Sequence, residues 1–372
     1  MNKIFNPLKN VDKFILIIVA LLGILSLVML ESTVYDEGLV LFSKAGRPVW
    51  IQAVAYFLGF GVLLFIQQFD YRFFSGLEKY LYIASIALLL TVYIPGLGVT
   101  QFGSRAWITL GITTLQPSEF VKILFVLLMA GYLSEHRDEL NNFVGVIKAL
   151  LYAAPIIVIV LKEDLGSALV YMVMWVFMVF FAGIDYKIFF QSILVCLAAI
   201  PVVYKFLDDY QKERIEAFLH PENLSLSGNY QVWQSKVAIG SGGLTGKGLF
   251  RGTQKGLDFI PVQQSDFIYS VVVEELGFIG GAVVVALYAF LMIRFTKIIR
   301  DSVDLYGALI VIGFTGMFLF QVFENIAMTM GLMPVTGITL PLLSGGGTSV
   351  IASMISIGII VNVGVNSKAI NF

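Results

Sequence analysis

The sequence predicts an all-α polytopic membrane protein, with about ten transmembrane helices in a single domain over residues 1–372. Of its 372 residues, 58% are hydrophobic and only 13% are charged, whereas a soluble domain carries about 25% charged residues. Apolar runs of about 20 residues, the length that spans a bilayer, recur along the whole chain. The only sizeable polar stretch lies around residues 207–265. These observations exclude a soluble domain that carries a few membrane anchors.

The apolar runs place the predicted helices in order along the chain. They cover residues 13–31, 48–68, 79–95, 117–133, 144–161, 165–183, 188–206, 267–293, 304–326 and 346–366. Lys3 and Lys9 precede the first run, and no small-residue cleavage site follows it. We therefore expect a retained signal-anchor helix and no cleaved signal peptide. Ten spans place both termini on the same side of the membrane.

Lys and Arg in the short loops predict that both termini are cytoplasmic (N-in, C-in), because these residues concentrate on that side. In this orientation the outer short loops hold four of them: Lys44, Arg47, Arg105 and Lys162. The inner side holds twelve: Lys3, Lys9, Lys13, Arg72, Lys79, Arg137, Lys148, Lys187, Arg294, Lys297, Arg300 and Lys368. The loop over 207–265, between the seventh and eighth helices, then faces outward. Its own charges do not count, since long loops translocate largely regardless of charge.

Residues with special backbone properties gather in the predicted outer loops. Gly-rich or Pro-containing stretches lie at 96–118, 241–248, 333–341 and 344–349, while the inner loops are short and ordinary. This asymmetry favours a functional site on the outer face. No internal repeat is evident, which disfavours a transporter built from inverted repeats.

Composition gives little support to nucleic-acid, disulfide or metal chemistry. The net charge is −1, so there is no case for a nucleic-acid partner. Cys196 is the only cysteine, and His136 and His220 lie far apart without metal-ligand spacing. No metal site can be assigned from these residues.

Ionisable residues within or beside membrane spans are costly and therefore indicate functional sites. The candidates are Glu119, Lys122, Glu163, Asp164, Asp266, Glu274, Glu275 and Glu324. Glu119 and Lys122 are three residues apart and share a helix face. They form either an internal ion pair or the charged floor of an outer cavity, with Arg105 above it.

Two aspartates stand at predicted helix starts on the outer side. Asp164 fits a helix N-cap better than a substrate contact, because an Asp side chain accepts from exposed backbone N–H groups there. The same explanation is weaker for Asp266, since Ser265 could cap the helix in its place. We favour a functional Asp266, because partial desolvation raises the pKa of an acid and makes it a better base near neutral pH.

The glycine-rich segment 241–248 is not a nucleotide-binding loop. The P-loop pattern needs Gly four residues before Gly-Lys and Ser or Thr after it, and Ser241 and Gly248 stand at those positions. A flexible loop is the favoured interpretation, and a phosphate cradle with Lys247 is the alternative. Basic residues in the long loop form either a solvated face or a pocket for an anionic lipid headgroup. They are Arg214, Lys236, Lys247, Arg251 and Lys255.

Seven segments, in order, resemble the SEDS family (shape, elongation, division and sporulation), and most closely its RodA branch. They are Gly-Ser-Arg-Ala-Trp-Ile at 103–108, Gln-Pro-Ser-Glu-Phe-Val-Lys at 116–122, Asp-Leu-Gly-Ser-Ala at 164–168, Gln-Ser-Lys-Val-Ala-Ile-Gly-Ser-Gly-Gly at 234–243, Ser-Asp-Phe-Ile-Tyr-Ser-Val at 265–271, Glu-Glu-Leu-Gly-Phe-Ile-Gly at 274–280 and Pro-Val-Thr-Gly-Ile at 334–338. Gly-Thr-Gln at 252–254 and Phe-Ile-Pro at 259–261 resemble the elongation branch. One departure is Lys162-Glu163, where family members often have Gln-Pro.

The resemblance implies a peptidoglycan glycosyltransferase in the bacterial cytoplasmic membrane that polymerises lipid II on the outer face. The family's proposed catalytic aspartate matches Asp266. Its polar cavity residues match Arg105, Glu119, Lys122 and Asp164, with Ser235 and Lys247 less closely matched. The resemblance also implies a class B penicillin-binding protein as partner and a divalent cation, Mg or Mn.

The residue types suit an inverting transfer from lipid II. Asp266 would take the proton of an acceptor sugar hydroxyl, and undecaprenyl pyrophosphate would leave. Pyrophosphate needs no strong general acid once cations such as Arg105, Lys122 or Arg214 neutralise its charge. Two alternatives remain at this point: a lipid II flippase, which predicts polar residues through the whole bilayer depth, and a non-catalytic scaffold, in which Asp266 is dispensable.

Overall fold

The structure of the chain, a computed structural model, describes residues 11–34, 46–101, 104–109, 111, 114–226, 228–253 and 263–369. Nine helices in these ranges are long and apolar enough to cross a membrane. They are α1 (Lys13–Val34), α2 (Arg47–Ile66), α4 (Pro117–Glu135), α5 (Phe143–Glu163), α6 (Leu165–Ala182), α7 (Tyr186–Lys205), α11 (Ile268–Asp301), α12 (Leu305–Thr329) and α13 (Gly347–Ala369). The predicted class of a helical, multi-pass membrane protein is confirmed.

The third predicted span, residues 79–95, is shorter than a full crossing. It corresponds to α3 (Glu78–Leu90), followed by the 3₁₀ helix η3 (Thr91–Tyr93). The 13 residues of α3 rise about 20 Å, less than the roughly 30 Å of a hydrocarbon core. Hydropathy alone did not reveal where this helix ends, because the apolar run continues past it into η3.

A small sheet follows α3, in a segment that the sequence analysis treated as a loop. Strands β1 (Gly98–Gln101), β2 (Ser104–Thr109) and β3 (Thr114–Leu115) pair antiparallel in that order. Val99 lies opposite Trp107, and Ile108 lies opposite Leu115. β-branched and aromatic residues favour strands, so the signal was present although short.

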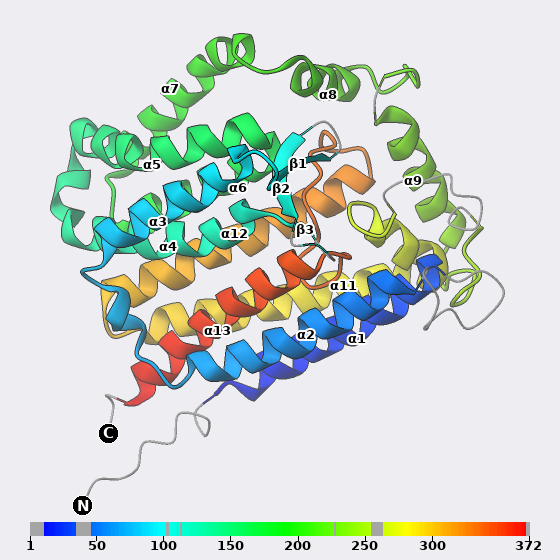
Figure 1. The fold of residues 1–372 in the computed structure, drawn as a ribbon, viewed down its shortest axis with the longest axis horizontal. Coiled ribbons are helices and arrows are strands. Elements are labelled where there is room, and N and C mark those ends of the chain that lie inside the picture. Colours follow the sequence, from blue (N-terminus) through cyan, green and yellow to red (C-terminus); the bar gives the residue numbers. More distant parts are fainter. Residues whose placement is uncertain are drawn as a thin grey trace, which may run out of the picture.

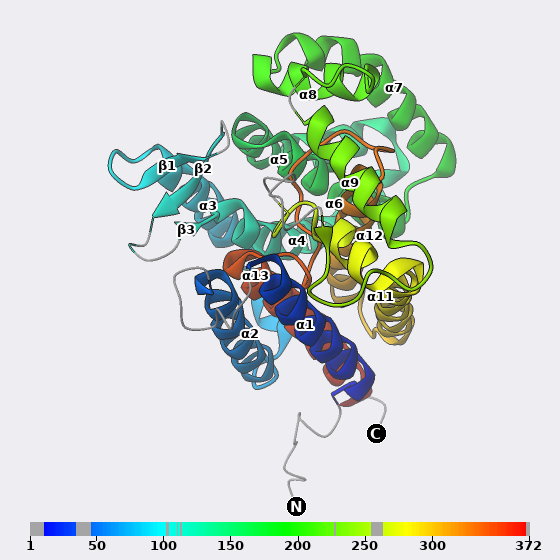
Figure 2. The same ribbon diagram turned by 90° about the vertical axis from the view of Figure 1, so that its right-hand side faces the viewer.

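The helices lie side by side, and their burial separates a centre from an edge (Figures 1 and 2). The centre is formed by α4, α12 and α13, the spans with the largest buried shares, whereas α7 is exposed along its length. Figure 1 shows α7 running above α5 and α6 at one edge. The start of α1 and the end of α13 lie toward the same end of the bundle, away from α9.

Within its described residues, the long loop between α7 and α11 contains the helices α8 (Asp209–Leu219) and α9 (Asn229–Gly242). Asp208 and Gln211 form a capping box that begins α8. Helix α9 packs against the first part of α11 (Figure 2). Within α11, Gly277 has φ 70° and ψ −170°, so the helix is interrupted there. The loop is therefore a folded layer over one end of the bundle.

Candidate active site around Asp266

Asp266 lies in the turn that leads into α11, and three contacts hold this turn in place. The side-chain amide of Asn325, from α12, donates to the carbonyl of Asp266 at 2.9 Å and to that of Ile338 at 2.8 Å. The N–H of Gly345 donates to the carbonyl of Gln264 at 2.7 Å. The half-buried carboxylate is thus positioned by α12 and by the segment before α13.

Arg214, from α8, is the cation that faces this carboxylate. Its Nη1 donates to the carbonyl of Thr336 at 3.0 Å, and its guanidinium lies 5.7 Å from the centre of the Tyr210 ring. A Cβ atom added at Gly337 would stand 3.7 Å from Oδ2 of Asp266 and 3.8 Å from Nη1 of Arg214. Gly337 therefore borders the space between the two charges and leaves it open.

The surroundings of Asp266 bring its titration close to neutral pH. Burial raises the pKa of Asp266 to about 6; the hydrogen bond from Ser265 and the charge of Arg214 oppose this rise, and the charge of Asp164 adds to it. A carboxylate with this pKa is ionised at neutral pH and remains basic enough to accept a proton.

Asp164 caps the N-terminus of α6, as the sequence analysis favoured over a substrate contact. It accepts from the N–H of Gly166 at 3.1 Å, and from the N–H and Oγ of Ser167 at 3.0 and 2.6 Å. A Cβ atom at Gly166 would stand 2.7 Å from the carbonyl oxygen of Thr336, so α6 begins directly against the Thr336 segment. The cap brings a second carboxylate within electrostatic reach of Asp266.

A third acid, Glu324 of α12, lies fully buried beneath the same segment. The hydroxyl of Thr336 donates to Glu324 Oε1, and Oε2 of the carboxylate has no hydrogen-bond partner. Its electrostatic neighbours include Asp266, Asp164 and Arg214. We call Asp164, Arg214, Asp266 and Glu324 the Asp266 cluster.

Glu119 and Lys122 form an internal ion pair, which is one of the two arrangements that the sequence predicts for them. Lys122 Nζ lies 2.6 Å from Glu119 Oε1, and both side chains are buried. Beside them, Tyr171 of α6 donates to the carbonyl of Ser118 at 2.6 Å. The charge of Lys122 is thus balanced inside α4.

Arg105 is exposed on the small sheet, where its Nε donates to the carbonyl of Val92 at 3.0 Å. The hydroxyl of Ser104 donates to the carbonyl of Glu163 and docks the sheet on the end of α5. Glu163 itself is buried, and neither carboxylate oxygen has a hydrogen-bond partner. The contacts of Arg105 therefore join it to η3 and not to the Asp266 cluster.

Ser235 and Lys247 hold α9 and the glycine-rich segment in place. Ser235 is buried, and its Oγ donates to the carbonyl of Thr329 at 2.8 Å, which ties α9 to the end of α12. Lys247 Nζ lies 2.7 Å from Glu274 Oε1 and 2.7 Å from the hydroxyl of Thr253. These partners all belong to the framework around α11.

The glycine-rich segment 241–248 is packed, so the flexible-loop interpretation was wrong. The N–H groups of Lys247 and Gly248 donate to the carbonyls of Glu274 and Glu275, each at 3.0 Å. Two amides of a phosphate cradle are therefore already used. Sequence inspection missed this docking because the partners lie some 27 residues away on α11.

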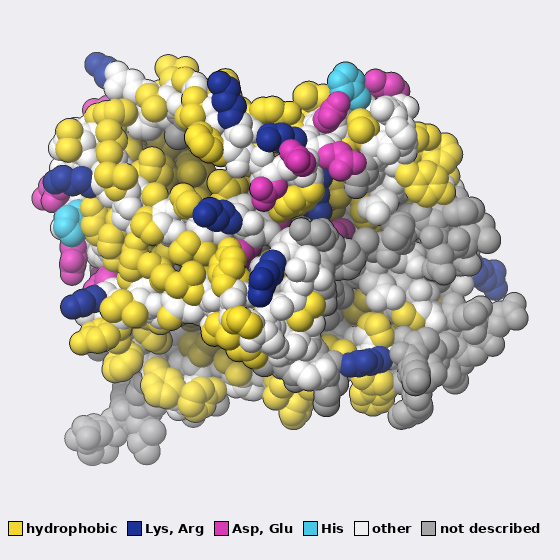
Figure 3. Space-filling view, turned by 45° about the horizontal axis from the view of Figure 1, so that its top comes forward, with side chains coloured by type: hydrophobic (Ala, Val, Ile, Leu, Met, Phe, Trp, Pro, Cys, Tyr) yellow, Lys and Arg dark blue, Asp and Glu magenta, His cyan; other side chains and the backbone are white. Residues whose placement is uncertain are grey.

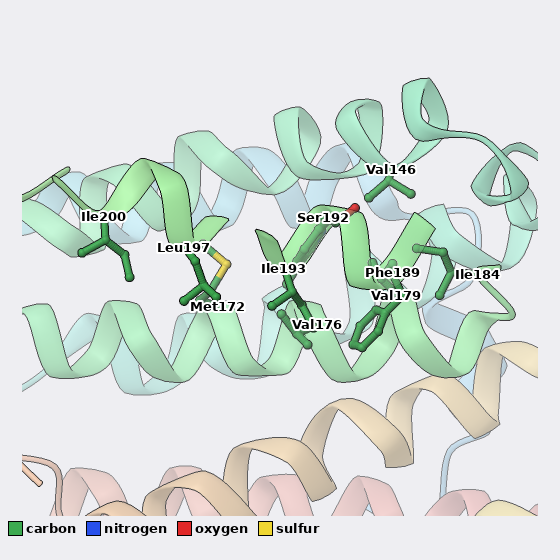
Figure 4. A pocket seen from close by; sticks show the side chains of 11 residues that line it. Val146, Met172, Val176, Val179, Ile184, Phe189, Ser192, Ile193, Leu197 and Ile200 are labelled. Atoms are coloured by element: carbon green, nitrogen blue, oxygen red, sulfur yellow. The ribbon is translucent and has the colours of Figure 1, made fainter. Parts of the chain in front are cut away.

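An apolar groove lies between α7 and the pair α5–α6 (Figure 4). Its volume is about 240 Å³. It is lined by Val146, Met172, Trp175, Val176, Val179, Ile184, Phe189, Ser192, Ile193, Leu197 and Ile200. The groove follows the helix that leads directly to α8, which carries Arg214. Figure 3 shows hydrophobic side chains over much of the face on this side, with a group of acidic side chains in its upper middle part and basic side chains more widely spread.

The structure identifies site residues that the sequence did not. Thr336 and Gly337 belong to a recognised motif, but nothing local indicated that they separate Arg214 from Asp266. Asn325 carried no signal. Among the described residues, no group of three His, Cys, Asp or Glu side chains could hold a metal ion. The divalent cation that the resemblance implies therefore remains a prediction.

Comparison with known proteins identifies relatives over nearly the whole chain. A family model described as cell cycle protein, covering FtsW, RodA and SpoVE, matches residues 12–369. The peptidoglycan glycosyltransferase MrdB of Escherichia coli K12 is 33% identical over 355 residues, which cover 93% of this chain and 94% of MrdB. Stage V sporulation protein E of Bacillus subtilis 168 is 37% identical over 311 residues, or 82% and 84% of the two chains.

Two solved structures share this fold. RodA of Thermus thermophilus aligns with a TM-score of 0.68 at 28% identity and covers 95% of this chain and 96% of its own. A chain of a peptidoglycan synthase complex that coordinates polymerization and crosslinking aligns with a TM-score of 0.79 at 28% identity, covering 96% and 98%. Residues 254–262, which include most of the elongation-branch stretch, lie outside the described residues.

Proposed function

Because the chain belongs to the family of FtsW, RodA and SpoVE, we infer that it is a peptidoglycan glycosyltransferase that polymerises lipid II. Full-length similarity to MrdB supports this activity, and the structural match to RodA supports a role in cell elongation. The product is a β1,4-linked glycan strand, and the released group is undecaprenyl pyrophosphate.

Asp266 is the proposed general base, and the observation that supports this role is the half-buried surrounding of its carboxylate. It is a half-buried acid with a pKa of about 6, held at the outer end of the bundle and facing one cation. It takes the proton of the C4 hydroxyl of an N-acetylglucosamine unit as that oxygen attacks the anomeric carbon of N-acetylmuramic acid. The new C–O bond forms as the bond to pyrophosphate breaks, and the pyrophosphate leaves with the electron pair.

Arg214 is the best-placed cation to stabilise the leaving pyrophosphate. It lies in the Asp266 cluster, across Gly337 from the base. Lys122 is buried and paired with Glu119, and Arg105 contacts Val92 on the sheet. A fixed positive charge where negative charge develops lowers the barrier without proton transfer to the leaving group.

The apolar groove beside α7 offers a place for the polyprenyl tail. Its lining is almost wholly hydrocarbon, and transfer of apolar surface into such a lining is favourable. A tail in the groove would present its pyrophosphate toward α8 and Arg214. In this arrangement the site faces outward, as the distribution of Lys and Arg in the short loops predicts.

We further propose that the chain works with a class B penicillin-binding protein. The support is its match to a chain from a complex that coordinates polymerization with crosslinking. Such an enzyme would cross-link the strands that this chain makes.

The decisive experiment measures glycan formation and lipid movement in the same liposomes. The purified chain with its partner should convert lipid II into long glycan, while Asp266→Asn and Asp266→Ala should reduce the rate by at least about 10³-fold, as expected for loss of a general base that also sets the geometry. Asp209→Asn, an exposed position on α8, should leave the rate unchanged.

Two outcomes would contradict the proposal. Full polymerisation by Asp266→Ala would exclude Asp266 as the base. Lipid II movement across the bilayer without glycan formation by the intact chain would identify a flippase.

A further inference from the structure

A second cavity lies apart from the Asp266 cluster, between the outer ends of α1 and α2. Its volume is about 310 Å³. It is lined by Leu27, Val28, Glu31, Val49, Trp50, Ala53 and Phe250. All of these side chains are apolar except Glu31, and none has a role in the proposed glycosyl transfer.

Glu31 has no partner in this apolar lining. Both of its carboxylate oxygens are buried and lack a hydrogen-bond partner. An ionised carboxylate without a partner in an apolar site is costly, and native proteins pair such groups. Glu31 stands three residues before the last residue of α1, Val34. This corresponds to about 5 Å along the helix and puts the carboxylate near the membrane surface, at the depth of lipid headgroups.

The walls of the cavity are held in place by contacts outside it. Ser32, beside Glu31, turns inward and donates to Glu275 Oε1 at 2.6 Å. The N–H of Phe250 donates to Glu275 Oε2 at 3.1 Å. Phe250 has φ 65°, an uncommon backbone conformation for a bulky residue. One carboxylate on α11 therefore fixes both the helix that carries Glu31 and the residue that covers the cavity.

The chemistry of the lining defines what would fill it. The occupant must donate hydrogen bonds to Glu31, carry positive charge, and place hydrocarbon against Trp50, Val49 and Leu27. The N-terminus of α2, which begins at Arg47, lies one turn from Trp50 and provides partial positive charge for an adjoining phosphate. A primary ammonium and a phosphate joined to acyl chains satisfy all of these requirements together.

We propose that this cavity binds a phospholipid with a primary ammonium headgroup. The ammonium group pairs with Glu31, and the part of the acyl chain nearest the headgroup packs on Trp50. A whole transmembrane helix is about 10 Å wide and would rest outside a cavity of this size. Bound lipid would brace Phe250 and, through Glu275, the glycine-rich segment at the start of α11. This site is separate from the proposed glycosyltransferase function and can be tested without measuring activity.

The test compares two lipids that differ only in the headgroup nitrogen. The full chain, released from nanodiscs of equal phosphatidylethanolamine and phosphatidylcholine, is analysed by native mass spectrometry for retained lipid. Phosphatidylcholine keeps the positive charge but has no N–H donor. We expect about a tenfold preference for phosphatidylethanolamine in the wild type, because a hydrogen bond to a charged group contributes about 1.5–3 kcal/mol.

Glu31→Gln should abolish this preference, and Glu135→Gln, at the exposed end of α4, is the matched control that should keep it. The lipid-dependent change in Tm supplies a second readout, in which each variant is its own reference: phosphatidylethanolamine should raise the Tm of the wild type more than that of Glu31→Gln. Equal retention of the two lipids by the wild type, or an undiminished preference in Glu31→Gln, would overturn the proposal. Loss of partner assembly in Glu31→Gln without any lipid preference would also overturn it, and would assign the cavity to a protein segment.

Discussion

Asp266 shows how the surroundings of one residue set its chemistry. Its side chain is an ordinary carboxylate, yet burial raises its pKa to about 6 while Arg214 limits the rise. Helix capping, the competing role for Asp266, is not observed: α11 begins after Phe267 without a side-chain cap, whereas Asp164 does cap α6. The two aspartates look alike in sequence and have different surroundings in the fold.

The raised pKa of Asp266 predicts an acidic limb in the pH profile of polymerisation. The base must be ionised, so the rate should rise with pH up to about 6 and level off above it. Well below the midpoint the rate should fall about tenfold per pH unit. Arg214→Gln removes an opposing positive charge and should move this limb to higher pH. A limb centred near 4 in single-turnover measurements would contradict the assignment.

Gly337 is the position where a single methyl group should disturb the site most directly. Its φ is 77°, and a side chain there costs about 1–2 kcal/mol in backbone strain and enters the space between Asp266 and Arg214. Gly337→Ala should reduce polymerisation at least about tenfold, with a modest loss of Tm.

Gly61→Ala, on α2 with nothing within 4 Å of the added Cβ, is the control for Gly337→Ala. It should leave both the rate and the Tm unchanged. Equal rates for the two variants would show that the space beside Gly337 is not used.

At the scale of elements, the glycine-rich segment and α11 form one packed unit. Gly246 and Gly277 face each other so closely that a Cβ on Gly277 would stand 2.3 Å from the nitrogen of Gly246. The interruption of α11 at Gly277 frees N–H groups beyond it, and those of Phe278 and Ile279 donate to the carbonyls of Gly243 and Leu244. The segment completes the hydrogen bonding of a broken helix.

Two glycines only six residues apart should therefore respond differently to alanine. Gly246→Ala would set a Cβ 2.1 Å from the carbonyl oxygen of Glu275 at φ 80°, and should lower stability by about 2 kcal/mol or more. Gly240→Ala, exposed on α9 with nothing within 4 Å, should be neutral or slightly stabilising, since Ala favours helix. Thermal melting in detergent measures both, and a similar Tm for the two variants would contradict the packed arrangement.

At the scale of the whole molecule, the fold gathers polar chemistry at one end of an apolar bundle. The end near the sheet, α8 and α9 carries the Asp266 cluster and the glycine-rich segment 241–248 (Figure 1). A flippase would need polar groups through the bilayer depth. The charged residues Glu119 and Lys122 instead neutralise each other.

The predicted orientation can be read with single cysteines in a Cys196→Ser background. Ser225→Cys, in the exposed turn between α8 and α9, should react with a membrane-impermeant maleimide in intact cells. Ser75→Cys, in the exposed turn between α2 and α3, should react only after permeabilisation. The opposite labelling pattern would invert the proposed topology.

The sequence by itself determined the membrane class, the order of the spans and the family. Hydrophobic runs and short motifs are local properties of the sequence, so they can be recognised without knowledge of the fold. It also identified Asp266 and the Glu119–Lys122 pair as candidates. It gave only a short signal for the sheet that follows α3. It could not reveal that α3 is short or that Lys247 is paired with Glu274, because these depend on where the backbone turns and on distant partners.

Only the tertiary structure decided which charges share a site. Asp164, Arg214, Asp266 and Glu324 come from four parts of the chain, and they meet around Thr336 and Gly337. The desolvation that moves the pKa of Asp266 is a property of that assembled surrounding, to which residues some 50 to 100 positions away contribute. The sequence therefore indicated an acid at the outer membrane surface, and the packing of distant segments brings the pKa of this acid to about 6.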